Sequence, residues 1–300
     1  MNYSTRAGYV VILGRPNVGK STLLNHLIGK KVSITARKAQ TTRNQILGIK
    51  TVDDAQVIYV DTPGVGGKAE LGKLATYMNN VVANILKDAD VIVLVVAGTA
   101  WKVEDTQALK IISRAKVPVI LAVNKLDLVN KNKSPAELND YFKTLTDKHP
   151  FVEILGVSAK YNLKIAELEK KIISLLPQGP FLFEKDRVTD RDHKFLASEI
   201  IREKLTRLLG QELPYALSVL VTSFEMRKKT VFIDATIYVE RLGQKKIVIG
   251  KGGETLKQIG TLSRGELEKL LLQKVCLKLW VKVKTNWTKD SELLRFLGYG

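Results

Sequence analysis

"GRPNVGKST", residues 14–22, follows directly on the apolar run "YVVIL" at residues 9–13. The order Gly14, four residues, Gly19, Lys20 and Ser21 matches the phosphate-binding loop G-x-x-x-x-G-K-[ST]. Its glycines let backbone N–H groups surround phosphates, and the helix expected over about 20–28 points its positive end at them. An ordinary glycine-rich turn is the alternative, but the strand before and the helix after favour a phosphate site. The stretch therefore predicts a site for a nucleoside triphosphate.

Two side chains of this loop carry the chemistry that a bound polyphosphate needs. Lys20 places a positive charge at the β- and γ-phosphates, and the Ser21 hydroxyl is a suitable ligand for Mg²⁺. The residues expected to line the site are Gly14, Arg15, Pro16, Asn17, Val18, Gly19, Lys20, Ser21 and Thr22.

Short apolar runs alternate with helix-length segments from residue 9 to residue 176. The runs lie at 9–13, 57–61, 91–96, 117–124 and 152–158, and the segments lie near 20–28, 70–87, 104–115, 134–148 and 164–176. Strands that are apolar on both faces and alternate with helices indicate an α/β domain, with a mostly parallel sheet covered on both faces. In such sheets the ligand lies at the carboxyl ends of the strands. We expect this domain to span 1–177.

The second half of the chain has a different pattern. A stretch with two prolines and a glycine predicts a linker over 178–190, and an α+β domain is expected over 191–300. Its expected order is a helix at 191–209, strands at 216–224 and 230–240, helices at 254–260 and 263–274, and a strand at 276–284. Apolar residues alternate along the last two strands, which predicts one buried face. We expect Trp280 and Trp287 to be packing residues, with base-stacking platforms as the alternative.

The composition limits the class of protein. Lys and Arg outnumber Asp and Glu by 48 to 30, a net charge of +18 that favours nucleic acid or anionic lipid without choosing between them. The single cysteine, Cys276, excludes an internal disulfide framework and fits a reducing cytosol. The longest apolar run, 91–97, is too short to span a bilayer, and no signal peptide is visible. We expect a cytoplasmic monomer, whose contact with the inner face of a membrane would be peripheral.

A second motif addresses which base is bound. "NKLD", residues 124–127, ends a buried strand. The Asp127 carboxylate accepts from both the ring N–H and the exocyclic amine of guanine, whereas adenine would leave it unpaired. Asn124 can bond the other edge of the base and tie the loop to the phosphate loop, and the Lys125 stem can cover the base. "SAK", which comprises Ser158, Ala159 and Lys160, places the Ala159 N–H near the guanine carbonyl oxygen. These residues predict GTP rather than ATP, and argue against a P-loop kinase or ATPase.

A third motif completes the phosphate site. "DTPG" comprises Asp61, Thr62, Pro63 and Gly64; Asp61 can hold Mg²⁺ through water, and the Gly64 N–H is placed for the γ-phosphate. The basic, hydroxyl-rich loop "KAQTTRN", 38–44, is suited to ordering by the γ-phosphate and Mg²⁺, although a solvated loop is the alternative. Val65 stands where Ras-type GTPases carry a glutamine that orients water. We therefore expect slow turnover, as in a switch.

Together, GRPNVGKS, TTRN, DTPG, NKLD and SAK resemble a translation-factor-class GTPase, and more narrowly the Era family. The resemblance covers nearly the whole chain, because "ASEIIREKL", "ELPY", "GQKKIVIGKGG" and "FLGY" are also similar to Era sequences. It implies a P-loop GTPase domain followed by a type II KH domain. It also implies Mg²⁺-dependent hydrolysis of GTP to GDP and phosphate, with Lys20, Thr42 and Gly64 as catalytic residues and Ser21, Thr42 and Asp61 as the metal site. Thr41 is the alternative to Thr42.

The same resemblance gives Asn17 two open roles. Related GTPases with this type of loop use potassium beside the nucleotide, which the Asn17 amide oxygen would coordinate. The alternative is a structural cap, in which the amide bonds the loop backbone.

The resemblance also gives the second domain a partner. A G-x-x-G turn, which we expect to lie between a strand-like run and a helix, comprises Ile249, Gly250, Lys251, Gly252 and Gly253. KH domains clamp the backbone of single-stranded nucleic acid on such a turn. Era proteins bind the 3′ end of 16S ribosomal RNA and assist assembly of the small (30S) ribosomal subunit, and this is the expected function. A membrane-associated signalling GTPase, whose basic second domain binds anionic lipid, is the alternative.

Overall fold

The computed structural model describes residues 4–35, 42–64, 73–98, 100–113, 115–129, 134–210, 217–297 and 299. The described residues form two compact units. The first is drawn from 1–33, 42–67 and 78–190, and the second from 34–41, 68–77 and 191–300. Ile34 and Thr35 thus belong with the second unit, although they follow the first helix of the first unit in sequence.

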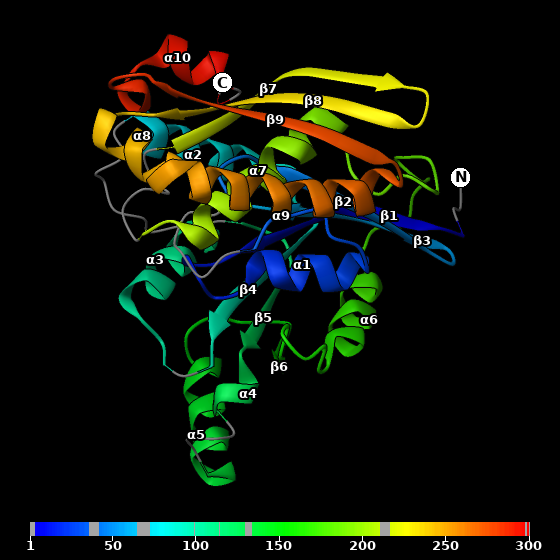
Figure 1. Ribbon diagram of the computed structural model, residues 1–300. Helices are drawn as coiled ribbons and strands as arrows, with labels where there is room; N and C mark the ends of the chain where they lie inside the picture. Colours follow the sequence, from blue (N-terminus) through cyan, green and yellow to red (C-terminus); the bar gives the residue numbers. More distant parts are fainter. Residues whose placement is uncertain are drawn as a thin grey trace. The chain divides into compact units, whose positions relative to one another are not determined.

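The first unit contains a six-stranded sheet in the order β2-β3-β1-β4-β5-β6 (Figure 1). Its strands are β1 Arg6–Leu13, β2 Ile46–Val52, β3 Ala55–Asp61, β4 Val91–Ala97, β5 Val119–Asn124 and β6 Glu153–Gly156. Its helices are α1 Lys20–Ile28, α3 Val103–Ile112, α4 Leu126–Val129, α5 Pro135–Thr146 and α6 Ile165–Leu175, and α2 Lys73–Ile85 has residues in both units. Every pair of neighbouring strands is parallel except β2 and β3. The predicted mostly parallel sheet is confirmed.

Helices cover both faces of this sheet, as its doubly apolar strands predicted. Alternate residues of β1 point to opposite sides, with Val10 and Ile12 in one buried cluster and Val11 and Leu13 in the other. Residues of α1 and α6 complete the first cluster, and residues of α3 and α5 belong to the second. Because β1, β3 and β5 are neighbouring or near-neighbouring parallel strands, the motifs that follow them meet at one edge of the sheet.

The segment 178–190, expected to be a linker, is hydrogen-bonded along the first unit. The Gly179 N–H donates to the Thr5 carbonyl over 3.0 Å, and the Ile49 N–H donates to the Val188 carbonyl over 2.8 Å. The Gln56 side chain, which is fully buried, donates to the Phe183 carbonyl and accepts from the Phe183 N–H. The segment is therefore held against the edge of the domain by its backbone.

The second unit contains a three-stranded sheet whose longer helices pack on one face. Its elements are α7 His193–Leu208, β7 Leu217–Arg227, β8 Thr230–Val239, α8 Leu242–Ile249, α9 Glu254–Leu271, β9 Lys274–Val283 and α10 Ser291–Phe296, with single 3₁₀ turns at Lys251–Gly253 and Trp287–Lys289. Strand β8 pairs antiparallel with β7 and parallel with β9. Ile201 and Leu205 of α7 and Ile259 of α9 pack on Ala235 and Ile237 of β8.

Three expectations for this unit were wrong. The strand-like run before the glycine turn is the end of helix α8, whose Val248 is fully buried. The two expected helices after the turn are one helix, α9, which is continuous through Gly260 because Ile259, Ser263 and Leu267 are buried on one face. Trp287 is buried as expected, but Trp280 is 58% exposed. Tertiary packing outweighs local propensity in the first two cases.

Within the described ranges, no helix is both long and apolar enough to cross a membrane. The same residues contain no group of three or more His, Cys, Asp or Glu side chains arranged to hold a metal ion.

Candidate nucleotide site and glycine turn

The phosphate loop turns sharply between β1 and α1. Gly19 has φ +102°, and a Cβ there would lie 2.4 Å from the Asn124 side-chain nitrogen. Lys20, only 7% exposed, donates from Nζ to the Gly14 carbonyl over 2.9 Å and to the Arg15 carbonyl over 3.1 Å. Burial lowers the pKa of Lys20 to about 8, with Asp61 opposing the effect and Arg15 adding to it. A buried ammonium surrounded by loop backbone is suited to an anion.

Three hydroxyl groups converge on one oxygen of the buried Asp61 carboxylate. Its Oδ2 accepts from Ser21 Oγ at 2.8 Å, from Ser33 Oγ at 2.7 Å and from Thr42 Oγ1 at 3.1 Å. Its Oδ1 is buried and has no hydrogen-bond partner among the described residues. Burial raises the pKa of Asp61, although the Lys20 charge and the hydroxyls oppose this. Hard oxygen donors around an unsatisfied carboxylate oxygen fit Mg²⁺.

Two residues discussed with this cluster, Thr41 and Val65, lie outside the described residues. Thr42 is described, is 5% exposed and has its hydroxyl 3.0 Å from that of Ser21. The geometry thus brings together the three predicted metal-site residues. Ser33 joins them unpredicted, because a single serine in "KVSITARK" matches no motif.

Asn124, 2% exposed, ties three loops together with one side chain. Its Nδ2 donates to the Val18 carbonyl in the phosphate loop over 2.8 Å. Its Oδ1 accepts from the Lys125 N–H at 2.8 Å and from the Ala159 N–H at 2.9 Å. The expected tie to the phosphate loop is present. The Ala159 N–H, expected to donate to the guanine carbonyl oxygen, donates to Asn124 Oδ1 in this structure.

The other two residues of the base motif have distinct surroundings. Lys125 donates from Nζ to the Asn17 carbonyl over 2.6 Å, and burial lowers the pKa of Lys125. Its stem therefore runs from the base loop to the phosphate loop. Asp127 Oδ1 accepts from Ser158 Oγ at 2.6 Å, which fixes the orientation of the half-buried carboxylate. No protein partner of the other carboxylate oxygen is found within the described part of the chain, so it is available to a ligand.

Several predicted residues serve the scaffold of this site. Val18 is fully buried, and Thr62, also buried, donates from Oγ1 to the Ile12 carbonyl over 2.9 Å. Arg15 Nε lies 3.1 Å from the carboxylate of Asp105, the residue that caps α3. Gly64 approaches Pro16 so closely that a Cβ would lie 2.8 Å from the Pro16 ring. Pro63 is buried, Thr22 is half-buried on α1, and Lys160 is exposed with its Nζ 2.9 Å from the Tyr161 hydroxyl.

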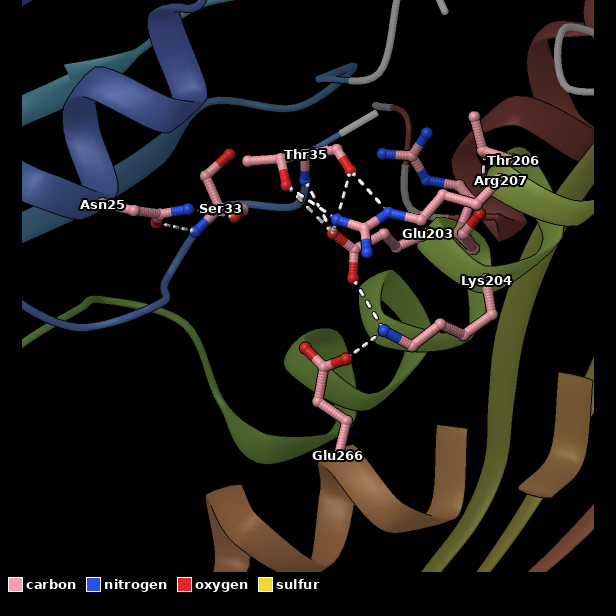
Figure 2. A network of polar contacts seen from close by, with 9 residues as sticks. Asn25, Ser33, Thr35, Glu203, Lys204, Thr206, Arg207 and Glu266 are labelled. Carbon is pink, nitrogen blue, oxygen red and sulfur yellow. Dashed lines mark hydrogen bonds and ion pairs between the residues drawn. The ribbon is translucent and has the colours of Figure 1, made fainter. Parts of the chain in front are cut away.

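A polar network in the second unit holds Thr35 by its backbone (Figure 2). Glu203 of α7, fully buried, accepts from the Thr35 N–H at 2.9 Å. Arg207 donates from Nε and Nη2 to the Thr35 carbonyl over 3.0 and 2.9 Å, and also pairs with Glu203. Lys204 bridges Glu203 to Glu266 of α9. No local sequence pattern predicts this network, because Thr35 and Glu203 are 168 residues apart.

The glycine turn of the second unit requires glycine at its first position. Gly250 has φ +77°, and a Cβ there would lie 2.2 Å from the Thr255 hydroxyl and 2.9 Å from the Thr255 nitrogen. Gly252 and Gly253 also have positive φ, but space around them is open. Lys251 is exposed, and the 18-residue helix α9 begins at Glu254. An exposed lysine and the N-terminus of a long helix together favour phosphate groups at this turn.

Comparisons with known proteins match one family model to each half of the chain. The family model described as "50S ribosome-binding GTPase" matches residues 9–125, and that described as "KH domain" matches 212–288. GTPase Era of Coxiella burnetii (strain Dugway 5J108-111) is 48% identical over 295 residues, which are 98% of each chain. The chain belongs to the Era family of GTPases. GTPase Era of Pseudomonas fluorescens (strain Pf0-1) is 47% identical over 299 residues, covering 99% of this chain and 98% of that one.

Two solved structures of the same family match nearly the full length. One is a crystal structure of Era in complex with MgGDPNP and nucleotides 1506–1542 of 16S ribosomal RNA, with a TM-score of 0.94, 38% identity and 99% of both chains covered. The other is a single-residue variant of Aquifex aeolicus Era bound to GDP.AlF4-, with a TM-score of 0.92, 37% identity, and 99% of this chain and 100% of that one covered. The P-loop GTPase domain followed by a KH domain is therefore established for this chain.

Proposed function

We propose that this GTPase binds GTP with Mg²⁺ at the edge of the first sheet, between the phosphate loop and the loops after β3, β5 and β6. The geometry of Asp61 is the main support for the proposal. Its Oδ2 accepts hydrogen bonds from the hydroxyls of Ser21 and Thr42, while its Oδ1 has no hydrogen-bond partner among the described residues. Era bound to MgGDPNP in a related structure supports the same choice of ligands. When bound, Mg²⁺ would neutralise charge on the β- and γ-phosphates.

The residues of this site then take separate roles. Lys20 and the N–H groups of the phosphate loop hold the phosphates, and the Gly64 N–H donates to the γ-phosphate. Ser21 and Thr42 supply hydroxyl ligands to Mg²⁺, and Asp61 holds it through water. Asp127 selects guanine, with Asn124 fixing the loops around the base. Val65 has no polar side-chain atom to place water, so we propose slow hydrolysis, as in a switch.

A substitution at the loop tests this assignment. Lys20→Ala and Ser21→Ala should abolish GTP binding or turnover and leave the fold intact, because neither group belongs to the apolar core. Ser174→Ala is the matched control, since its exposed hydroxyl bonds only the Lys171 carbonyl on α6. Isothermal titration that finds wild-type GTP affinity, together with wild-type turnover, in both loop variants would remove the assignment.

We propose that Asn17 coordinates K⁺ beside the nucleotide. Asn17 is exposed, has φ +65°, and its side chain has no hydrogen bond to any described residue, which disfavours the structural cap. A cation at this place would offset charge that develops on the phosphates. Turnover should be faster in K⁺ than in Na⁺ at equal ionic strength, and Asn17→Ala should remove the difference. Equal wild-type rates in the two salts would leave Asn17 without this role.

For the second unit, we propose that the turn Ile249–Gly253 clamps single-stranded RNA at the 3′ end of 16S ribosomal RNA. The open surroundings of Gly252 and Gly253, the exposed Lys251 and the start of α9 support close approach of phosphates. The related Era structure that contains nucleotides 1506–1542 of 16S RNA supports the choice of RNA. We further propose that the GTPase assists 30S assembly. Crosslinking in cells followed by sequencing of bound RNA tests both claims, and recovery of no 16S 3′-end sequence would contradict them.

We propose domain boundaries at 1–177, 178–190 and 191–300, and a monomeric cytoplasmic protein. The alternative is a peripheral membrane GTPase, favoured by the net charge of +18. RNA and anionic-liposome pulldowns with Gly253→Asp separate the two. The added carboxylate should repel RNA phosphates at the turn and leave lipid binding unchanged. Binding of the wild-type chain to anionic liposomes but not to the RNA would favour the membrane function.

A further inference from the structure

The outer face of the second sheet carries two exposed aromatic side chains. Strand pairing puts Phe232 of β8 beside Cys276 of β9, and Thr236 beside Trp280. Trp280 is 58% exposed and Phe232 is 37% exposed, whereas the opposite face of the same strands is buried against α7 and α9. Towards one end of the outer face Phe296 of α10 packs on Tyr238, and both Tyr238 and Thr236 are buried. An indole left this exposed on a regular strand contributes little to the core.

Cationic side chains flank the indole on the same face. Lys278 and Lys282 lie two residues to either side of Trp280 on β9, and both are exposed. The Arg227 guanidinium lies 5.1 Å from the Phe232 ring centroid. Two acidic residues share the face: Asp234, paired in register with Lys278, and Glu225, which is bonded to Arg227. Lysines on an edge strand also discourage pairing with other strands, but that function does not account for Trp280.

The face lies on the opposite side of the sheet from the glycine turn. Val248 of α8 and Ile259 of α9, which flank the turn, pack on the inner face with Ala235 and Ile237. A ligand at the turn therefore lies on the helical side of the unit. Contact with both places therefore requires an RNA long enough to pass from one face of the sheet to the other.

We propose that Phe232, Lys278, Trp280 and Lys282 form a second RNA-contacting surface. An unpaired base stacks on the Trp280 indole, and Lys278 and Lys282 contact the flanking phosphates, as on other aromatic and basic platforms for single strands. The proposal rests on RNA binding at the turn, and adds to it a contact that only RNA extending beyond the turn can make.

The test compares two RNAs on the full chain. One is a six-nucleotide oligonucleotide from the 16S 3′ end, and the other is nucleotides 1506–1542. Trp280→Ala should weaken binding of the long RNA about tenfold, as expected for one lost base stack, and change the short one less than about twofold. Trp280→Phe should retain most of the affinity. Unchanged long-RNA affinity in Trp280→Ala, or equal losses for both RNAs, would overturn the proposal.

Charge and fluorescence give two independent readouts. Lys278→Gln with Lys282→Gln should lower the slope of log affinity against log salt by about 1.4 for the long RNA only. Lys110→Gln with Lys143→Gln, two exposed lysines of the first unit, is the matched control. The long RNA should quench tryptophan fluorescence in the wild type and not in Trp280→Phe. Binding of the six-nucleotide RNA by the wild-type protein tests the proposed RNA contact at the glycine turn separately. Loss of binding to 30S subunits with unchanged RNA affinity in Trp280→Ala would overturn the RNA assignment in favour of a protein partner.

Discussion

Replacing Asn124 by alanine should destabilise the first unit and should lower its affinity for all guanine nucleotides to a similar extent. The substitution removes three hydrogen bonds, to the Val18 carbonyl and to the N–H groups of Lys125 and Ala159. Val18 and Ala159 are 0% and 1% exposed, so water does not readily replace the lost partner. At about 1 kcal/mol per lost bond, with part of the cost relieved by local rearrangement, we expect a loss of about 2–4 kcal/mol.

The effect of the substitution on nucleotide binding follows from the loops that the Asn124 side chain joins. Because Asn124 connects the phosphate loop with both loops beside the base, GDP and GTP affinities should fall together, with the guanine-to-xanthine preference unchanged. Urea unfolding followed by hydrogen exchange of β5 amides measures the stability of this unit, and titration calorimetry measures the nucleotides. Asp127→Asn is the control for stability alone, since among the described residues its half-buried carboxylate bonds only Ser158. A stability loss under about 0.5 kcal/mol, or an altered base preference in Asn124→Ala, would refute the reasoning.

Three further predictions concern the base site, the phosphate loop and the glycine turn. Asp127→Asn should shift preference from GTP toward XTP, measured by competition, because an amide donates where the carboxylate accepts; an unchanged ratio would remove Asp127 from the base site. Burial lowers the pKa of Lys20 to about 8 in the nucleotide-free protein, so above pH 8 GTP binding should take up a proton and weaken, as calorimetry in two buffers would report. Gly250→Ala should destabilise the second unit, with Gly252→Ala much milder, because only the former places a Cβ against Thr255; equal melting temperatures would contradict this.

The local sequence pattern was sufficient to predict an element where its ends or its buried face are set by residues within that element. Helix α1 was expected over about 20–28 and is observed at Lys20–Ile28, because its phosphate-loop start and its glycine end are both local signals. The alternation in β8 correctly predicted its buried face. Strand β2 was missed, because "ILGIKTV" has no clear period and is ordered by its pairing with β3.

The remaining differences depend on contacts distant in sequence. "KKIVIG" contains β-branched residues that favour a strand, yet α8 is helical, since Gln244 caps its start and Val248 enters the core. Ser33 could not be identified as a partner of Asp61 without the fold. The clamp of Thr35 by Glu203 joins segments 168 residues apart. Side chains that act through distant partners are therefore the part of the site that the sequence did not predict.

The clamping of 16S RNA by the turn is tested most directly at Gly252. This residue has φ +59° and no atom within 4 Å of an added Cβ, a conformation that Asp and Asn tolerate better than other side chains. Gly252→Asp and Gly252→Asn differ by one negative charge at nearly the same shape. The affinity of the full chain for a 16S 3′-end oligonucleotide, measured by fluorescence anisotropy, should fall at least about tenfold further in Gly252→Asp than in Gly252→Asn, with GTP affinity unchanged in both. Equal RNA affinity for the two variants would contradict the assignment of this turn.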